Sequence, residues 1–86
     1  MYIERIRFMK IALYNEHIEI IRYLRTFYLY SKDDLLMCLY DTCQHSNIKL
    51  CNTLGINAMD SIGYANKLYR YSYRVPNLQI NGEWLI

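Results

Sequence analysis

Apolar residues recur at helical spacing along the first thirty residues of the chain. Residues 2–30 contain no glycine and no proline. One apolar column repeats every seven residues, at Ile6, Leu13, Ile20 and Phe27. The apolar face around this column is wider than a coiled-coil seam, and it predicts one helix of about 28 residues or two helices that break near Asn15–Glu16. We favour the break, because asparagine is a weak helix former and most helices are shorter. A continuous helix would instead favour a helical dimer interface.

A further helix is predicted after Ser31. The segment Ser31-Lys-Asp-Asp34 is a variant of the capping box, with carboxylates near the positive end of the helix dipole. An apolar stripe follows at Leu35, Leu36, Leu39 and either Thr42 or Cys43. We therefore expect an amphipathic helix of about three turns from this cap.

A short helix is predicted next, after a polar break at residues 44–46. Either Ser46 or Asn47 can cap it, because each side chain can accept a hydrogen bond from a free backbone N–H group. Its apolar face consists of Ile48, Leu50, Cys51 and Leu54. Gly55 is expected to end it, where the chain must enter the left-handed region.

A longer helix is predicted from Ala58 to Tyr71, with Asp60 or Ser61 as its cap. Its expected inward face consists of Met59, Ile62, Ala65 and Leu68, with Tyr69 as a further candidate. Its expected outward residues are Asp60, Ser61, Tyr64, Lys67 and Tyr71, with Asn66 and Arg70 at the margins. Gly63 inside the helix would permit a close approach by another helix or a ligand.

A β-hairpin is predicted at the end of the chain. Pro76 ends the helical region, and Asn81–Gly82 separates two short apolar segments, residues 78–80 and 83–85. Asn-Gly favours a type I′ turn, which needs positive φ at both central residues. The expected fold is therefore mainly α, with four to five helices and a C-terminal β-hairpin, in the manner of a winged helix-turn-helix.

Length and cysteine content limit the organisation of the protein. The 86 residues are enough for one domain, with residues 2–30 as an N-terminal helical or dimerisation region and residues 31–86 carrying the remaining helices and the hairpin. Three cysteines at unconventional spacing indicate free thiols rather than a disulfide scaffold. No signal peptide or membrane span is predicted, so we expect an intracellular protein in the cytoplasm, nucleoid or nucleus.

The pair of helices around Gly55 fits a helix-turn-helix. Such a motif needs a small residue in its first helix, here Cys51, and a glycine four residues later. Apolar neighbours on both sides are Leu50, Leu54 and Ile56. The position six residues past the glycine, usually apolar, is Ser61. We therefore expect a turn that is one residue longer, with Ile62 in that position.

The last twelve residues resemble the wing of the excisionase-like helix-turn-helix domains of phages and mobile elements. The segment reads Val75-Pro-Asn-Leu-Gln-Ile-Asn-Gly-Glu-Trp-Leu-Ile86. In that family a Leu-Pro, a short strand, a Gly-rich turn and a strand with an early tryptophan follow the recognition helix. The resemblance implies a small regulator of transcription that binds duplex DNA with helix 58–71 and a C-terminal wing. From the apolar face of residues 2–30, separately, we expect the N-terminal helices to dimerise.

Charge distribution supports this expectation more than net charge does. The net charge is only +2, but no acidic residue occurs between Asp60 and Glu83. The candidate DNA-binding residues are Ser61, Tyr64, Asn66, Lys67, Arg70, Arg74 and Asn81. The lysine and the arginines would neutralise phosphates, the serine and tyrosine would bond phosphate oxygens, and Asn66 could read adenine.

A second function class remains open from the sequence. Residues 17–24, His-Ile-Glu-Ile-Ile-Arg-Tyr-Leu, resemble the second helix of an ankyrin-like repeat, and residues 47–54 echo them thirty residues later. Ten tyrosines can line an interface, because tyrosine joins an apolar ring to a polar tip. The alternative is therefore a helical protein-binding module that uses a tyrosine-rich surface to bind a host or viral protein, either as an inhibitor or as an ankyrin-like interaction protein.

Catalytic and metal-binding patterns are weak. His17 and His45 are expected in structural roles, and a Cys43/His45/Cys51 metal cluster would have unconventional spacing. The sequence shows no phosphate-binding loop, nucleophile elbow or paired-carboxylate site. We expect no enzymatic activity and no cofactor.

Overall fold

The computed structural model describes the backbone of residues 2–73 and the side chains of residues 3–68. This part of the chain forms five α-helices. They are α1 (Tyr2–Tyr14), α2 (Ile18–Phe27), α3 (Lys32–Asp41), α4 (Ile48–Leu54) and α5 (Ala58–Tyr73).

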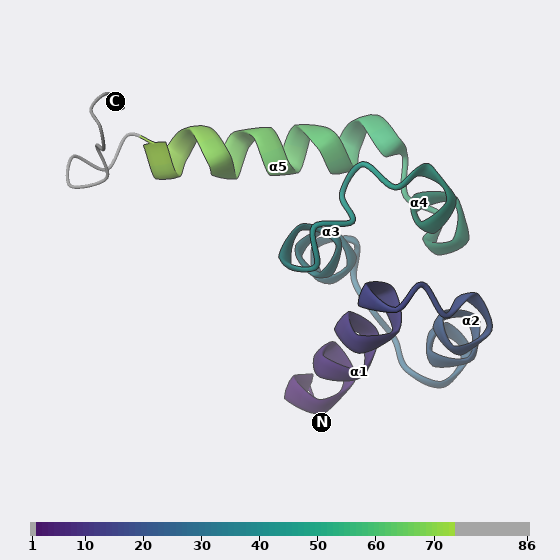
Figure 1. The fold of residues 1–86 in the computed structure, drawn as a ribbon. Helices are drawn as coiled ribbons and strands as arrows, with labels where there is room; N and C mark the ends of the chain where they lie inside the picture. The colour runs from purple at the N-terminus through teal and green to yellow at the C-terminus, as the bar shows by residue number, and fades with distance from the viewer. Residues whose placement is uncertain (1, 74–86) are drawn as a thin grey trace.

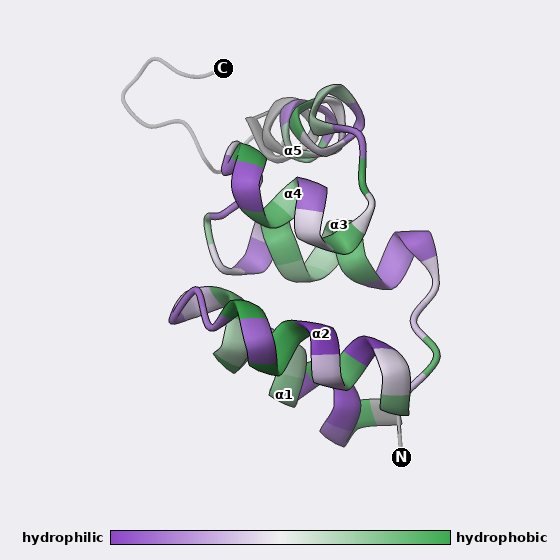
Figure 2. Cartoon of the chain, turned by 90° about the vertical axis from the view of Figure 1, so that its right-hand side faces the viewer, coloured by the Kyte–Doolittle hydropathy of each residue, from purple (hydrophilic) through white to green (hydrophobic). Residues whose placement is uncertain are grey.

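The helices stack in three layers, as Figures 1 and 2 show. Helices α1 and α2 pair in the first layer, α3 and α4 form the second, and α5 forms the third. Across the layers, α1 packs on α3, α2 on α4, and α3 on α5. Helix α1 begins at residue 2 and α3 at residue 32, and α2 begins at residue 18 and α4 at residue 48. Helices α1 and α2 therefore each pack on a helix that begins thirty residues later in the chain. This neighbour-on-neighbour stacking is the arrangement of helical-repeat proteins.

The predicted break in the N-terminal segment is confirmed. Helix α1 ends at Tyr14, and Glu16 then adopts a positive φ of 54° before α2 begins at Ile18. The Asn15 side chain donates a hydrogen bond to the Ile11 carbonyl at 2.9 Å and so satisfies an end carbonyl of α1. The break lets α1 and α2 fold back on each other rather than form one long helix.

Local capping chemistry explains where the next helices begin and end. The Ser31 hydroxyl accepts from the Asp34 backbone N–H at 3.1 Å, and the Asp34 carboxylate accepts from the Ser31 N–H at 3.2 Å, which confirms the capping box. Asn47 rather than Ser46 caps α4, since its side-chain oxygen accepts from the Leu50 N–H at 3.1 Å. Gly55 follows α4 with φ of 73°, as predicted.

The core runs between the layers. Four of its fully buried side chains, one from each of the first four helices, are Met9, Ile21, Leu39 and Leu50. These side chains come from the first and second layers. Each helix therefore depends on the layer next to it for most of its burial.

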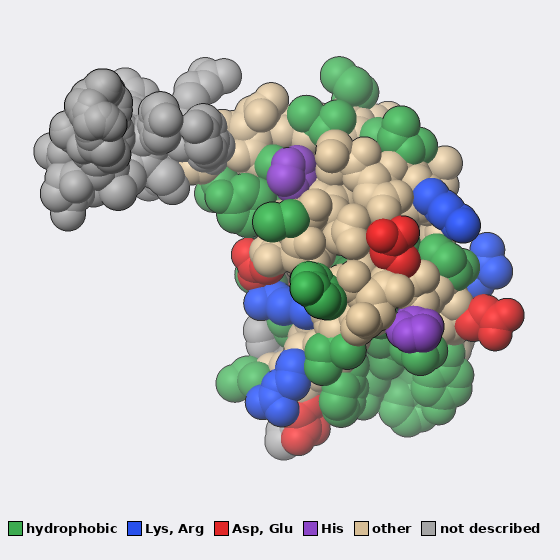
Figure 3. Space-filling model, viewed as in Figure 1, with side chains coloured by type: hydrophobic (Ala, Val, Ile, Leu, Met, Phe, Trp, Pro, Cys, Tyr) green, Lys and Arg blue, Asp and Glu red, His purple; other side chains and the backbone are tan. Residues whose placement is uncertain are grey.

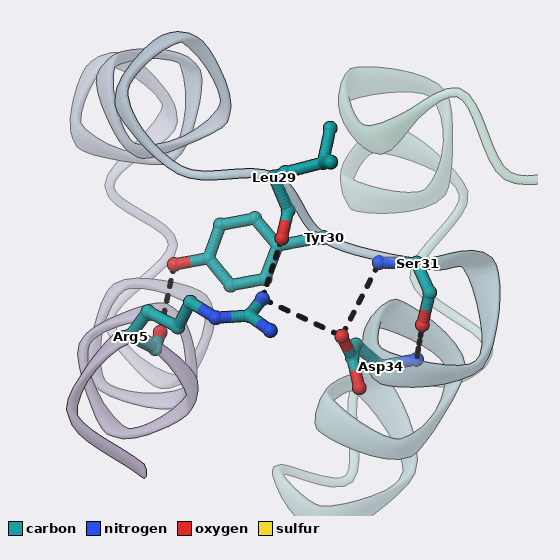
Figure 4. Close-up of polar contacts among 5 residues, drawn as sticks. All are labelled: Arg5, Leu29, Tyr30, Ser31 and Asp34. Carbon is teal, nitrogen blue, oxygen red and sulfur yellow. Dashed lines mark hydrogen bonds and ion pairs between the residues drawn. The ribbon is translucent and has the colours of Figure 1, made fainter. Parts of the chain in front are cut away.

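A polar cluster joins the first layer to the connection between α2 and α3 (Figure 4). The Arg5 guanidinium donates to the Leu29 carbonyl and forms an ion pair with Asp34 at 3.5 Å. It also lies 5.4 Å from the centre of the Tyr30 ring, whose hydroxyl donates to the Arg5 carbonyl at 2.7 Å. The buried tyrosine ring and the capping aspartate thus fix where α1 meets the start of α3.

The winged helix-turn-helix expectation for the fold is wrong. All the secondary-structure elements among the described residues are α-helices, with no strand, so the mainly α part of the prediction is supported and the wing is not. The predicted hairpin, residues 78–85, and Pro76 lie outside the described residues. Helix α5 begins at Ala58 as predicted and runs to Tyr73, beyond the expected end at Tyr71. Its first turn is capped by Asn57, whose side chain accepts from the Met59 N–H at 2.8 Å, rather than by Asp60 or Ser61.

Candidate binding surfaces

Ser61 does not lie on an exposed surface. Its side chain is 1% exposed, and its hydroxyl donates a hydrogen bond to the His45 carbonyl at 2.7 Å. It therefore occupies the inward position six residues past Gly55, where a helix-turn-helix usually has an apolar residue. The expected phosphate contact from Ser61 is wrong, and so is the expected longer turn that would have put Ile62 in its place.

The inward face of α5 is rotated from the prediction for a physical reason. A small serine with a hydrogen-bond partner can be buried at little cost, because its hydroxyl remains satisfied. Met59, expected inside, is 72% exposed, whereas Ala65 is buried as predicted. Tyr64, expected outside, is half-buried and packs edge-on against Tyr40, with ring centroids 6.2 Å apart. Burial raises the pKa of the Tyr64 phenol.

The remaining candidate DNA-binding residues are only partly placed. Asn66 and Lys67 are exposed neighbours on α5. The side chain of Arg70 and all of Arg74 and Asn81 lie outside the described residues, so the shared cationic surface stays a prediction.

The described surface beside Lys67 carries both signs of charge. A shallow groove of about 460 Å³ runs between α3 and α5, and its charged lining residues are Lys32, Asp33, Asp60 and Lys67. Lys32 is paired with Asp60 at 2.9 Å. This part of α5 is therefore less cationic than the acid-free sequence after Asp60 suggested.

A second surface lies at the opposite end of the stack, on the side of α1 and α2 that faces away from α3 and α4. We call it the outer face, and its members are Phe8, Ile11, Ile20, Tyr23 and Phe27. All five are exposed, with Tyr23 at 61% and Phe27 at 64%. In Figure 3, hydrophobic side chains gather at the lower right, over the region of α1 and α2.

The outer face contains an apolar groove between its two helices. The groove has a volume of about 280 Å³. Its lining residues are Phe8, Ile11, Ala12, His17, Ile20, Tyr23 and Leu24. The groove shows that the apolar side chains of α1 and α2 are contiguous rather than scattered over the surface.

Aromatic contacts organise one end of the outer face. Tyr23 stacks on Phe27 with ring centroids 5.8 Å apart, and Phe27 meets Tyr28 edge-on at 4.9 Å. Tyr28 in turn lies 6.5 Å from Phe8 on α1, measured between ring centroids. Rings held by other rings present a pre-ordered surface, so less side-chain entropy is lost when a partner binds.

The sequence contained a signal for this surface. The column at every seventh residue splits in the structure, because Ile6 and Leu13 are buried whereas Ile20 and Phe27 are exposed. Helix α2 already buries a separate stripe that includes Ile21 and Leu24. A ten-residue helix with two apolar stripes can bury one of them in the core of its own chain, and the second stripe then remains exposed.

Other candidate sites lack supporting geometry. Cys38 and Cys51 are buried and Cys43 is exposed, and among the described residues no three His, Cys, Asp or Glu side chains converge where they could hold a metal ion. His17 lies at the end of the apolar groove, and His45 packs on Tyr40 with centroids 6.0 Å apart. Within the described part of the chain, none of the helices has the length and apolar character needed to cross a membrane.

Comparison of the chain with protein-family models, with curated proteins and with solved structures found no match. Function is therefore inferred from the geometry of these surfaces.

Proposed function

We propose that this protein is a small helical protein-binding module, and that the outer face is where it binds its partner. The observation that carries the proposal is the contiguous, exposed apolar surface formed by Phe8, Ile11, Ile20, Tyr23 and Phe27. This is the protein-binding alternative from the sequence, with an apolar surface that contains one tyrosine, Tyr23, in place of the expected tyrosine-rich surface.

The layered architecture explains why this surface calls for a partner. In a stack of helix pairs, each pair covers the apolar face of its neighbour, and the terminal pairs need polar outer faces to remain soluble. Here α1 and α2 form a terminal layer in the described chain, yet their outer face is apolar. Contiguous exposed apolar surface with a polar rim is typical of protein interaction sites.

The residue types of the outer face also favour protein binding. Aromatic residues are enriched at the centres of interfaces, where a few of them supply most of the binding free energy. Tyr23 and Phe27 are the expected anchors, since they are large, well exposed and stacked on each other. Truncation of such an anchor costs about 2 kcal/mol or more of binding free energy.

Duplex-DNA binding through α5 remains a second proposal. The observation in its favour is that α4 and α5 are joined at Gly55 and that α5 exposes Asn66 and Lys67 side by side. Figure 1 shows α5 from the side and α4 nearly end-on, so the two helices cross. If the protein binds duplex DNA in this way, it should retard a DNA duplex in a gel-shift assay. Its affinity for the duplex should fall steeply as the salt concentration rises, and it should also fall in the double variant Lys67→Ala plus Arg70→Ala.

A matched pair of substitutions separates the two functions. Ile20 lies on the outer face and Ile48 is an exposed isoleucine on α4, so Ile20→Glu tests the surface and Ile48→Glu controls for an added acid. The full-length chain and both variants are used to capture proteins by chemical cross-linking in cells that carry the gene. We expect Ile20→Glu to lose the partner and Ile48→Glu to keep it. Equal capture by both variants would refute the role of the outer face.

A further inference from the structure

We infer that the protein bound by the outer face is a second copy of this chain, joined head to head about a two-fold axis. The inference rests on the proposed function, because it names the partner for that surface. It gives the possible homodimer through residues 2–30 a defined geometry, in which α1 and α2 of one copy lie antiparallel to the same helices of the other.

The two ends of the stack differ in polarity, which favours head-to-head pairing. The outer face is apolar, whereas α5, at the other end of the described stack, has a mixed surface that exposes Asn66 and Lys67 as well as Met59. Head-to-tail stacking would press apolar side chains against polar ones and would build a ring or an open filament. Head-to-head pairing covers the apolar surface of both copies and closes the assembly.

The apolar residues are arranged so that they can pair with themselves. Ile20, Tyr23 and Phe27 lie along one side of α2, and Tyr23 is the middle residue. In an antiparallel pair centred on Tyr23, Ile20 of each copy meets Phe27 of the other. Ile11 lies near the middle of α1 and borders the same groove as Tyr23, so one axis can pass close to both residues.

Charges along α1 are self-complementary in the same arrangement. Arg7 lies near the start of α1, and Glu16 lies just after its end, and both are exposed. An antiparallel pair centred on Ile11 brings Arg7 of each copy near Glu16 of the second copy. Two equivalent ion pairs result. A partner that carries charges of one sign could pair with only one of these two residues, whereas a second copy supplies an opposite charge for each.

The available area is consistent with a reversible dimer. Thirteen residues in α1 give a length of about 20 Å, and two helices side by side are about 20 Å wide, so the outer face covers roughly 400 Å² in projection. Side-chain relief brings the total buried by two copies to about 1,000 Å², the lower end for specific interfaces. We therefore expect dissociation in the micromolar range.

The inference is tested by sedimentation equilibrium of the full-length chain. Its concentration is varied from 1 to 200 µM, on the order of the dissociation constant expected for such an interface. The parent protein should pass from monomer to dimer across this range. Tyr23→Glu should remain monomeric, because the dimer would bury two unpaired carboxylates. It should stay folded by circular dichroism, because Tyr23 is exposed in the single chain. Ile48→Glu, on α4, should dimerise like the parent.

A charge-swap pair tests the antiparallel arrangement. Arg7→Glu alone and Glu16→Arg alone each place like charges together at two contacts, and each should weaken the dimer roughly tenfold. An equimolar mixture of the two variants restores opposite charges at both contacts. Native mass spectrometry should therefore show mainly the mixed dimer. Mixed and unmixed dimers in statistical proportion would overturn the head-to-head arrangement, and with it the inference.

The outcomes separate the dimer from the broader function. A parent chain that stays monomeric at 200 µM, on the order of the upper limit above, overturns the dimer. The proposed function then still stands if Ile20→Glu abolishes capture of a different protein. A parent dimer that Tyr23→Glu leaves intact overturns the dimer through this face. If capture also survives Ile20→Glu, the proposed function falls too.

Discussion

Replacing Leu39 with alanine should destabilise the protein by about 3 kcal/mol. Leu39 is 0% exposed and lies on α3, the helix that packs on α1 on one side and on α5 on the other. Loss of about three buried carbon groups removes roughly 2.4 kcal/mol of transfer free energy. A residual cavity of about 40 Å³ would add about 1 kcal/mol, and measured Leu→Ala changes in cores span about 2 to 5 kcal/mol. A chain of 86 residues has a total stability of only about 4 to 13 kcal/mol.

Urea denaturation followed by circular dichroism at the helical band measures this effect. Leu29→Ala is the matched control, because Leu29 is 90% exposed and its truncation should change the free energy of unfolding by less than about 0.5 kcal/mol. The slope with urea should be the same for the parent and both variants. A Leu39→Ala cost below about 1 kcal/mol, or equal costs at the two leucines, would contradict the layered core described above.

Three further predictions follow from local chemistry. Ser31→Ala removes the capping box of α3 and should lower the free energy of unfolding by about 1 kcal/mol, measured in the same urea experiment. Ellman's reagent at neutral pH should modify Cys43 rapidly, but Cys38 and Cys51 only after unfolding, since both are buried and burial raises the pKa of Cys38 to about 11. Burial also raises the pKa of Tyr30 to about 12 from an ordinary value of 10.0. The folded chain therefore holds its proton more tightly, so this contribution to stability is complete below pH 10 and is lost as pH rises towards 12. In Tyr30→Phe, this loss of stability with rising pH should be smaller. Urea midpoints measured across this pH range test the difference.

Helix boundaries were the most predictable part of the fold. The cap at Ser31, the stop at Gly55 and the break after Tyr14 depend on backbone groups within one turn of the residue concerned. Such interactions are encoded in a few consecutive side chains, so the pattern predicts them without knowledge of the tertiary contacts.

The orientation of each helix was less predictable. Met59 and Ser61 were assigned to the wrong sides of α5, because hydropathy favours burial of the methionine. The structure buries the serine instead, since the carbonyl of His45 lies within reach of its hydroxyl. That carbonyl comes from the connection before α4, sixteen residues earlier in the chain. No local pattern shows that it will be there.

For the candidate sites, too, the sequence pattern predicted local features, and the tertiary structure decided which side chains are buried. The two similar segments, residues 17–24 and 47–54, indicated a possible repeat, and the structure packs α2 against α4. The sequence pattern included two of the outer-face residues, Ile20 and Phe27. It could not show that Ile6 and Leu13 would be buried while Ile20 and Phe27 remained exposed.

The sequence by itself therefore determined that the described chain is helical, near which residues most of its helices start and stop, and how much apolar surface each carries. Only the tertiary structure decided which of that surface is covered, because coverage depends on which helices stack. Helices α3 and α4 cover one side of the first layer and leave the other side exposed. That exposed side is the outer face, and a hydropathy pattern does not distinguish it from core because both consist of apolar residues at helical spacing.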